Sequence, residues 1–454
     1  MQNAECRQLR RSESASVSCA RVEKWLFCML HFAFPMRILM LASSFPKWPG
    51  ETTAPFIEEI AAGVVARGHA VTLLLPFHPE LRRDDEVRGV QLRPFRYAPH
   101  PALNIWGYAQ SLLSDTQIKR RTLLAAPFAL AASGSAVARE LAAARRAGRP
   151  YDLVQAHWVL PNGPPAALAA AAYGTPLVVS LHGSDIYLAE RHWAMACAAA
   201  GAFRVAAAVT ACSGDLRARG VRLGARPATS SVIPYGVNPR QFRPNPAARA
   251  VVRAELGLAD GAPLVLGLGR LVAKKGFGVL LEAWPIVLRA CPAATLVIVG
   301  YGDLREPLER QAAQLGLGER VRFAGQLERE RTAAYLAAAD LFTLPIVRDG
   351  VDGLPNVLLE AMGAGRAVVA SRVAGVPDVV DDGVHGLLVP ERDPAALAAA
   401  IQRLLADPAL AARLGAAARA RVERELTWER AAERFEMVFR AVDGDGGRWT
   451  VDGK

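Results

Sequence analysis

The sequence predicts an α/β protein with two doubly wound, Rossmann-like domains that face a central cleft. Its 454 residues are 52% hydrophobic and 21% charged, which is enough chain and enough apolar content for two or three globular domains and excludes a mostly disordered protein. From residue 36 onward, short apolar runs alternate with amphipathic stretches, the pattern typical of a parallel sheet covered by helices. A Pro- and Asn-rich stretch at 233–246 interrupts the alternation, which then resumes, so we expect a linker there. No uncharged apolar window is long enough to cross a membrane.

The first half of the alternation predicts a sheet that begins directly after Met36. Expected strands lie at 38–42, 71–75, 153–156, 177–181 and 208–211. A helix near 55–67 is ended by Gly68, which breaks the helical pattern before the second strand. The segment 118–124 mixes basic and apolar residues on an expected surface helix, and an amphipathic helix lying on a membrane is the alternative.

The second half repeats the alternation with clearer spacing. Expected strands lie at 264–268, 295–299, 321–324, 341–344, 367–370 and 386–389. Expected helices lie at 277–289, 306–315, 332–339, 356–362, 394–405 and 428–442. Ligands of such folds bind at the carboxyl ends of the strands, and a cleft between two domains adds a second wall.

These patterns divide the chain into five parts. The N-terminal Rossmann-like domain spans 36–245, the C-terminal one spans 246–427, a closing helix spans 428–442, and a Gly- and Asp-rich tail spans 443–454. Residues 1–35 form a leader whose polar composition differs from that of the later chain, and a buried strand comes immediately after Met36. We interpret the leader as the result of a misassigned start, with a short membrane-surface anchor as the alternative.

Cysteine, histidine and charge patterns exclude several classes of protein. The six cysteines form no C-x-x-C pair, which favours reduced thiols in a cytoplasmic protein, and the eight histidines form no H-E-x-x-H zinc motif. Basic residues outnumber acidic ones by 23 to 13 within 36–245, but the count is 26 to 27 within 246–454. A basic half suggests an anionic partner, although an Arg-rich coding bias explains it equally well. Without a nucleic-acid motif, nucleic acid is the least favoured partner.

A glycine-rich turn follows the strand at 264–268. Gly267-Leu-Gly269 resembles the start of a dinucleotide fingerprint, but Val272 occupies the third glycine position, which argues against a nicotinamide enzyme. Arg270 and Lys275 follow, and two cations at a strand-to-helix turn can hold a diphosphate through charge-assisted bonds. Two solvated basic residues at a helix start are the alternative.

A second motif runs from Asp352 to Gly365. Gly353 allows a permissive loop, the helix at 356–362 begins after Pro355, and Asp352 lies on the loop while Glu360 lies two turns into the helix. A carboxylate on an apolar helix is costly unless it is hydrogen-bonded, and ribose hydroxyls would satisfy Glu360.

Two further motifs follow strands of the first half. His182 and Asp185 come directly after the strand at 177–181, where a ligand cleft is expected, although an ordinary turn histidine is the alternative. Gly50 lies in the loop after the first strand, where a glycine lets the backbone approach a ligand closely.

Taken together and in this order, these four motifs resemble family 4 glycosyltransferases, retaining enzymes of the GT-B fold. The similarity runs from about residue 36 to 442, and its most specific parts include His182-Gly-Ser-Asp185, Gly269-Arg-Leu-Val and Val299-Gly-Tyr-Gly302. The bacterial members that make exopolysaccharides or lipid-linked glycans look most similar. The resemblance implies hexosyl transfer from a nucleotide sugar to a glycan or lipid-linked acceptor in cell-surface polysaccharide synthesis.

The resemblance also implies roles for individual residues. His182, Arg270, Lys275 and Asp352 match catalytic positions, at which the two cations neutralise the leaving diphosphate. Donor-binding positions are Gly50, Gly269, Arg270, Lys275, Gly302, Gln326, Asp352, Gly353, Leu354, Asn356 and Glu360. Acceptor-side positions are Gly50, His182 and Asp185.

The implied chemistry needs no metal and no cofactor beyond the nucleotide sugar. Asp352 replaces the family's usual Glu, and Pro355 stands where many relatives have Gly, so the identity of the donor sugar stays open. We expect a cytoplasmic enzyme, with a peripheral contact at the inner face of the membrane through the basic N-terminal domain as an open alternative. A catalytically silent nucleotide-sugar-binding subunit and a sugar-nucleotide epimerase on the same fold are the competing functions.

Overall fold

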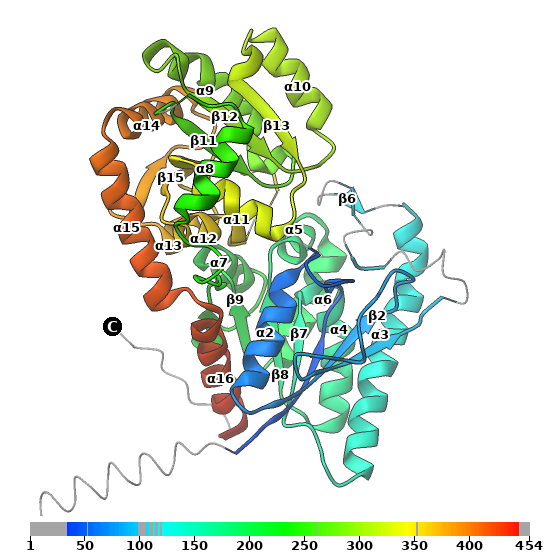
Figure 1. Ribbon diagram of the computed structural model, residues 1–454. Coiled ribbons are helices and arrows are strands. Elements are labelled where there is room, and N and C mark those ends of the chain that lie inside the picture. The colour runs from blue at the N-terminus through cyan, green and yellow to red at the C-terminus, as the bar shows by residue number, and fades with distance from the viewer. Residues whose placement is uncertain are drawn as a thin grey trace, which may run out of the picture. The chain divides into compact units, whose positions relative to one another are not determined.

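The computed structural model describes residues 34–51, 53–98, 106–108, 112–113, 117–118, 120–259, 261–350 and 353–444. Residues Arg37–Lys454 form one compact unit, which contains every helix and strand described below (Figure 1). Residues 1–33 of the predicted leader and residues 445–454 of the predicted tail lie outside the described residues.

The first sheet has eight strands in the order β10-β9-β8-β7-β1-β2-β4-β3. Their bounds are β1 Arg37–Leu41, β2 Ala70–Pro76, β3 Glu86–Val87, β4 Val90–Phe95, β7 Leu153–His157, β8 Leu177–Leu181, β9 Ala208–Ala211 and β10 Ser230–Val232. All neighbours pair in parallel except β3 with β4. The sequence patterns missed three of these strands, because β3 is two residues long, β4 carries Arg93 and Pro94, and β10 begins with two serines.

Helices cover both faces of this sheet (Figure 1). They are α2 Pro55–Ala66, α3 Arg120–Arg146, α4 Val159–Tyr173, α5 Ser184–Arg191, α6 Trp193–Val205 and α7 Gly214–Arg222. Helix α4 contacts α3, α5 and α6, whereas α2 contacts β2 and β4. A small antiparallel pair, β5 Leu112–Leu113 with β6 Gln117–Ile118, precedes α3.

The second sheet has six parallel strands in the order β13-β12-β11-β14-β15-β16. The strands are β11 Leu264–Leu268, β12 Thr295–Val299, β13 Val321–Gly325, β14 Leu341–Leu344, β15 Ala367–Ser371 and β16 Gly386–Val389. The helices are α8 Pro246–Glu255, α9 Phe277–Ala290, α10 Arg305–Gln314, α11 Arg329–Ala338, α12 Asn356–Gly363, α13 Val376–Val379, α14 Pro394–Ala406 and α15 Pro408–Glu425. Short 3₁₀ turns lie at Pro227–Thr229, Ala273–Lys275 and Gly318–Arg320. The prediction of two doubly wound sheets is confirmed.

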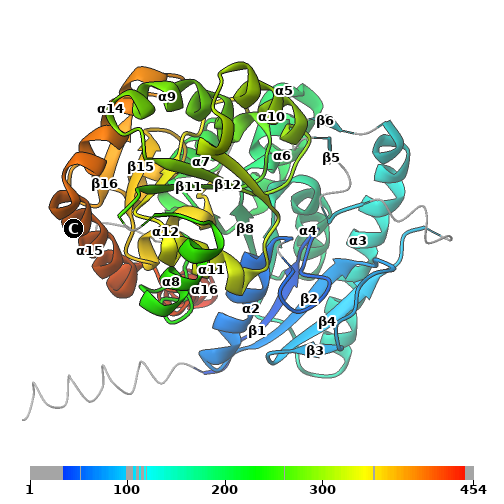
Figure 2. The ribbon, with the colours of Figure 1, turned by 45° about the horizontal axis from the view of Figure 1, so that its top comes forward.

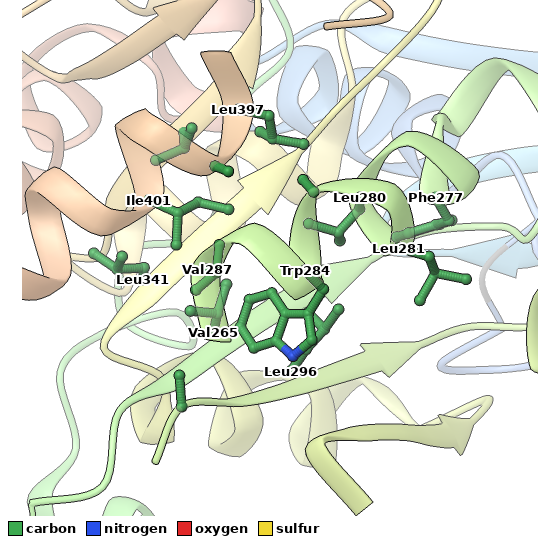
Figure 3. Close-up of a cluster of buried hydrophobic side chains, with 14 of the residues drawn as sticks. Val265, Phe277, Leu280, Leu281, Trp284, Val287, Leu296, Leu341, Leu397 and Ile401 are labelled. Carbon is green, nitrogen blue, oxygen red and sulfur yellow. The ribbon is translucent and has the colours of Figure 1, made fainter. Parts of the chain in front are cut away.

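Helices α9 and α14 pack together on one face of the second sheet, opposite α8, α11 and α12 (Figure 2). Trp284 of α9 lies fully buried in the cluster beneath them, with Leu280 from the same helix and Ile401 from α14 (Figure 3). Full burial of side chains of this size stabilises the fold by about 1.5–3 kcal/mol each. The cluster therefore fixes α9, the helix that follows the glycine-rich turn of the second sheet.

The last helix, α16 Trp428–Gly444, packs against α2 of the first sheet. The contact is close, because a Cβ placed on Gly63 would lie 2.9 Å from the Cβ of Ala432. Glu436 of the same helix pairs with Arg67 and with His69, whose Nε2 lies 3.3 Å from its carboxylate. The last described helix therefore packs against the half that contains β1 and α2.

Each sheet reverses its strand order once, and such a switch point is where open α/β sheets bind ligands. In the first sheet the reversal falls between β1 and β7, and in the second it falls between β11 and β14. Among the described residues no single helix is long and apolar enough to cross a membrane, although the bent pair α14 and α15 meets the length and composition test together.

Candidate active site

A cavity of about 780 Å³ lies at the carboxyl-terminal edges of both sheets, with walls from each half of the chain. Its volume falls within the range of roughly 300–1,000 Å³ that is usual for small-molecule sites. Ten of the residues singled out from the sequence line it: Gly50, His182, Gly269, Arg270, Lys275, Gln326, Gly353, Leu354, Asn356 and Glu360. The cavity therefore unites motifs that lie far apart in the chain. Asp352 lies outside the described residues.

Three cations enter the cavity from the turn after β11. Arg270 follows the strand directly, and Lys274 and Lys275 belong to the 3₁₀ turn Ala273–Lys275. Both lysine side chains are buried, each with only 7% of its surface exposed. Three positive charges in one cavity wall attract an anion, and charge-assisted hydrogen bonds from such groups to a phosphate are strong. Lys274 was not among the predicted site residues, although the Lys-Lys pair is visible in the sequence.

Glycines set the position of these cations. Gly276, the residue after Lys275, has a φ of +68°, and a Cβ there would lie 1.8 Å from the carbonyl oxygen of Pro345. A Cβ on Gly300 would likewise lie 1.8 Å from the carbonyl oxygen of Gly269. Backbone therefore packs directly against backbone at the ends of β11 and β12, as it can only where side chains are absent.

Gly302 was predicted to contact the donor, but the structure places it outside the cavity lining. It is not among the residues that line the cavity, and a Cβ on it would lie 2.4 Å from the carbonyl oxygen of Leu271. Its backbone supports the turn that carries Arg270, which explains why a glycine is needed there without any ligand.

Helix α12 contributes two polar side chains to the cavity wall of the second half. Asn356 and Glu360, one helical turn apart, both face the cavity. Among the described residues nothing donates a hydrogen bond to the buried Oδ1 of Asn356. A buried acceptor without a donor costs about 1–3 kcal/mol, which a bound donor group would recover. Gly353, just before the helix, lies against the first half, because its Cβ would be 2.8 Å from the carbonyl oxygen of His182.

Glu360 has a strongly altered acidity. Burial raises the pKa of its carboxyl to about 7, and the positive charge of Arg329 opposes this rise. Arg329 also lines the cavity, from the first residue of α11. At neutral pH the carboxyl is therefore poised between its protonated and ionised forms, a property typical of functional sites. No sequence motif had pointed to Arg329.

His182 lies in the cavity wall that the first sheet contributes, within a chain of hydrogen-bonded rings. Its Nδ1 lies 2.6 Å from the hydroxyl of Tyr235, and its Nε2 lies 3.1 Å from Nδ1 of His157. Burial holds the pKa of His182 well below its usual value, and the neighbouring His157 lowers it further. Burial also lowers the pKa of His157 to about 3. Both imidazoles are consequently neutral near pH 7, and protein groups occupy both ring nitrogens of His182.

Aromatic rings surround this histidine. The ring centroid of Phe56 lies 4.8 Å from that of His182, and the centroid of Trp158 lies 4.9 Å from it. Tyr235 stacks on Phe56 with a centroid separation of 4.7 Å. The three aromatic residues come from the start of α2, the end of β7 and the linker, so no local pattern in the sequence could have grouped them.

Asp185 was predicted on the acceptor side, but the structure gives it a different place. Its side chain is buried, with 1% exposed, and does not line the cavity. Its carboxylate accepts backbone hydrogen bonds from Gly183 at 2.8 Å, Val159 at 2.9 Å and His182 at 3.4 Å. Burial raises the pKa of Asp185, and these bonds oppose the rise. Asp185 thus holds the His182 loop in position from outside the cavity lining.

Gly50 lines the cavity as predicted, with a φ of +86° and no atom near the place of a Cβ. Among the described residues there is no group of three or more His, Cys, Asp or Glu side chains that could hold a metal ion.

Comparison with known proteins identifies the family of this chain. Residues 52–236 match the model of a glycosyl transferase 4-like domain, and residues 262–407 match that of glycosyl transferases group 1. A D-inositol 3-phosphate glycosyltransferase of Streptomyces scabiei is 34% identical over 321 residues, which cover 67% of this chain and 71% of that protein. The chain belongs to family 4 of the glycosyltransferases. A GDP-mannose-dependent alpha-(1-6)-phosphatidylinositol monomannoside mannosyltransferase of Mycolicibacterium smegmatis is 38% identical over 260 residues, 56% of this chain and 66% of that one.

Solved structures show that this family member has the GT-B fold. The crystal structure of Anabaena Alr3699/HepE in complex with UDP matches with a TM-score of 0.70 and 23% identity, over 89% of this chain and all of that one. The two sheets described above are the two Rossmann-like halves of that fold, which confirms the fold expected from the sequence.

Proposed function

We propose that this glycosyltransferase is a retaining, metal-independent hexosyltransferase that moves a hexosyl residue from a nucleotide sugar to a glycan or lipid-linked acceptor. One observation carries the proposal. Three cations, two of them buried lysines, share a cavity wall with Glu360 and face the neutral His182 of the other half. A nucleoside diphosphate sugar has a matching arrangement of charge, with two phosphates between a ribose and a sugar.

The cations would act on the bond that breaks. During transfer the bond from the sugar's anomeric carbon to the diphosphate oxygen breaks, and a bond from that carbon to the acceptor oxygen forms. Negative charge grows on the departing diphosphate, next to Arg270, Lys274 and Lys275, and preorganised charge of this kind is a main source of catalysis. The acceptor hydroxyl gives its proton to the departing phosphate as it attacks from the same face. Because protein cations supply the positive charge, we expect no need for a divalent metal.

The ribose end of the donor would lie along α12. Ionised Glu360 would accept hydrogen bonds from the two ribose hydroxyls, and Asn356 would accept one from a donor group of the ligand. The relatives differ in nucleotide, since one is named for GDP-mannose and the Anabaena structure contains UDP. We therefore leave the base open and treat mannosyl transfer as one instance of the proposed reaction.

We further propose a cytoplasmic protein that acts in cell-surface polysaccharide or glycolipid synthesis, with a peripheral contact at the inner face of the membrane. A relative named for a phosphatidylinositol mannoside supports an acceptor at that surface. The excess of basic residues within 36–245 supports attraction to anionic lipid.

A thermal-shift panel tests the donor site. The full chain is heated with UDP-, GDP-, ADP- and dTDP-sugars, with and without EDTA, and the same panel is run on Arg270→Ala/Lys275→Ala. A selective increase in Tm that EDTA leaves unchanged and the double variant loses is the expected result; a ligand at 100 times its Kd adds about 2.7 kcal/mol of stability. The matched control is Arg289→Ala/Arg310→Ala, which removes two exposed charges outside the cavity.

Turnover then separates this proposal from its competitors. We expect transfer of the sugar to an acceptor with retention at the anomeric carbon, seen by NMR of the product. Nucleotide-sugar binding without any turnover would identify a silent subunit, and a changed donor without transfer would identify an epimerase. Loss of the Tm increase on addition of EDTA would refute metal independence.

A further inference from the structure

The part of the cavity that helices α3, α4, α5 and α6 line is largely apolar, and we call it the apolar arm. This apolar arm is lined by Leu130, Leu160, Pro164, Leu188, Met195 and Ala198. These residues come from four consecutive helices, α3, α4, α5 and α6, which contact one another around α4. The arm therefore belongs entirely to the first half of the chain.

The topology of the sheet explains why the arm opens at the active site. Helices of a parallel α/β sheet run back against the strands, so those that lead from one strand to the next begin at the carboxyl-terminal edge. Leu160 and Pro164 lie in the first two turns of α4, Met195 and Ala198 lie in the first two turns of α6, and Leu130 lies in the N-terminal half of α3. That edge also carries His182, so the arm and the proposed reaction centre share one cavity.

The chemistry of the arm differs from that of the donor wall. All cavity-lining residues on α3 to α6 are uncharged, and the side chains of Leu130, Leu160, Leu188 and Met195 are half-buried. A polar glycan requires many hydrogen-bonding groups along its length, whereas Thr122 and Ser184 are the only described lining residues of these helices whose side chains can form hydrogen bonds. A hydrocarbon chain requires only apolar contact and removal from water.

Large apolar side chains also lie outside the arm, at the same edge of the sheet. Leu124 and Phe128 on the outer side of α3 are 78% and 66% exposed, and Trp193 at the start of α6 is 82% exposed. Scattered exposed apolar residues are ordinary, but these three lie near the starts of the two helices that flank α4. They supply apolar contact where a lipid chain would enter from a membrane.

We propose that the apolar arm binds a hydrocarbon chain of a lipid acceptor, with the acceptor hydroxyl placed beside Trp158 and His182. The inference rests on the proposed function, since it assumes that an acceptor is bound in this cavity. It adds a site for the acceptor's tail, which the donor wall and the aromatic cluster do not supply.

Calorimetric titration of the full chain with n-alkyl α-D-mannopyranosides tests the arm. Methyl, butyl, hexyl and octyl compounds are used below the concentrations at which they aggregate, alongside the same tails on glucose. Each methylene buried in the arm should tighten binding about fourfold, so octyl should bind about fifteenfold more tightly than hexyl. Dependence on tail length with either sugar is the expected result.

Four variants test whether the alkyl tail binds in the apolar arm. Ala198→Phe fills the arm and Met195→Glu charges it, and both should flatten the dependence on tail length. Ala143→Phe and Leu168→Glu make the same changes at exposed positions of α3 and α4 and should retain it. Nucleotide-sugar thermal shifts measured on each variant show that it is folded and that its donor site is intact.

Three outcomes would overturn the inference. One is affinity that does not depend on tail length, and another is the same dependence in all four variants, which would place the tail elsewhere. The third is a concentration-dependent dimer that Ala198→Phe abolishes, which would show that a second copy of the chain fills the arm. Failure of the proposed function would instead appear as a lack of nucleotide-sugar binding or turnover. The two failures are distinguishable because the dependence of affinity on tail length is measured without a nucleotide sugar.

Discussion

Replacing Glu360 by Gln should make the protein more stable at alkaline pH and weaken its binding of nucleotide sugars. The pKa of Glu360 rises from its usual 4.5 to about 7 in the folded protein. Each unit of difference corresponds to about 1.4 kcal/mol, so ionising this carboxyl costs the folded state about 3 kcal/mol. An amide of the same shape cannot ionise and avoids that cost.

The sign of the pH dependence follows from proton counting. Between pH 4.5 and about 7 the unfolded chain has lost the proton of Glu360 while the folded protein still holds it. The free energy of unfolding therefore falls as pH rises through this interval, and the loss is complete above pH 7. Glu360→Gln should unfold at nearly the wild-type temperature at pH 4.5. At pH 8 it should unfold about 3 °C higher, because a chain of 454 residues shifts by about 1 °C per kcal/mol.

Nucleotide binding should change in the opposite direction. Two ribose hydroxyls can donate to a carboxylate, whereas the amide nitrogen of Gln accepts nothing. Hydrogen bonds to a charged acceptor contribute about 1.5–3 kcal/mol, so we expect the Kd to rise at least tenfold. In the wild type, the Kd should also rise as pH falls below 7, because a proton must leave before both bonds form.

Paired thermal and calorimetric titrations at pH 4.5, 6 and 8 check both effects. Glu306→Gln, an exposed glutamate on α10, is the matched control and should change neither. A variant that is less stable than the wild type at pH 8 would refute the raised pKa of Glu360. A variant that binds nucleotide sugar as tightly as the wild type would refute the assignment of Glu360 to the ribose.

The remaining predictions concern the cations, the turn that carries them and the rings around His182. Arg270→Ala and Lys275→Ala should each lower kcat about 10²-fold or more in a steady-state transfer assay, because each removes charge from the departing diphosphate; an unchanged kcat would exclude that role. Gly276→Ala places a Cβ 1.8 Å from a carbonyl oxygen at a positive φ, so it should abolish nucleotide thermal shifts even where circular dichroism shows a folded protein. Tyr235→Phe leaves Nδ1 of His182 without its 2.6 Å partner and should cost about 1–3 kcal/mol in denaturant unfolding, with an unchanged Kd for the nucleotide sugar.

Periodicity in the sequence predicted the fold class because most strands of both sheets are buried on both faces. Runs such as 264–268 and 295–299 are apolar almost throughout, and they became β11 and β12 with the expected bounds. The missed strands β4 and β10 lie toward the two edges of the first sheet, where polar residues and a proline are tolerated. Their pairing depends on tertiary neighbours that a local pattern does not record.

The sequence predicted the cavity-lining residues correctly where several of them lie close together within one motif. One such group, in the turn after β11, consists of Gly269, Arg270 and Lys275. A second, at the start of α12, consists of Gly353, Asn356 and Glu360. The members of each group line the cavity together because they are close in the sequence. Asp185 shows the limit of such reasoning. A polar residue after a strand can serve the backbone of the loop as readily as a ligand, and only its three backbone hydrogen bonds decide between the two.

The cations proposed to bind the diphosphate are placed by local packing and do not follow the net charge of the two halves. The first half of the chain carries the excess of basic residues, yet the three cations of the turn after β11, and Arg329 beside Glu360, all come from the half in which acidic residues slightly outnumber basic ones. Several arginines of the basic half are paired on the protein itself, as Arg83 is with Glu58 and Arg219 with Glu190. What concentrates positive charge in the cavity is the glycine-dependent turn, which buries two lysines side by side against backbone. A local packing constraint, and not the overall charge of a domain, therefore places the cations where a diphosphate would leave.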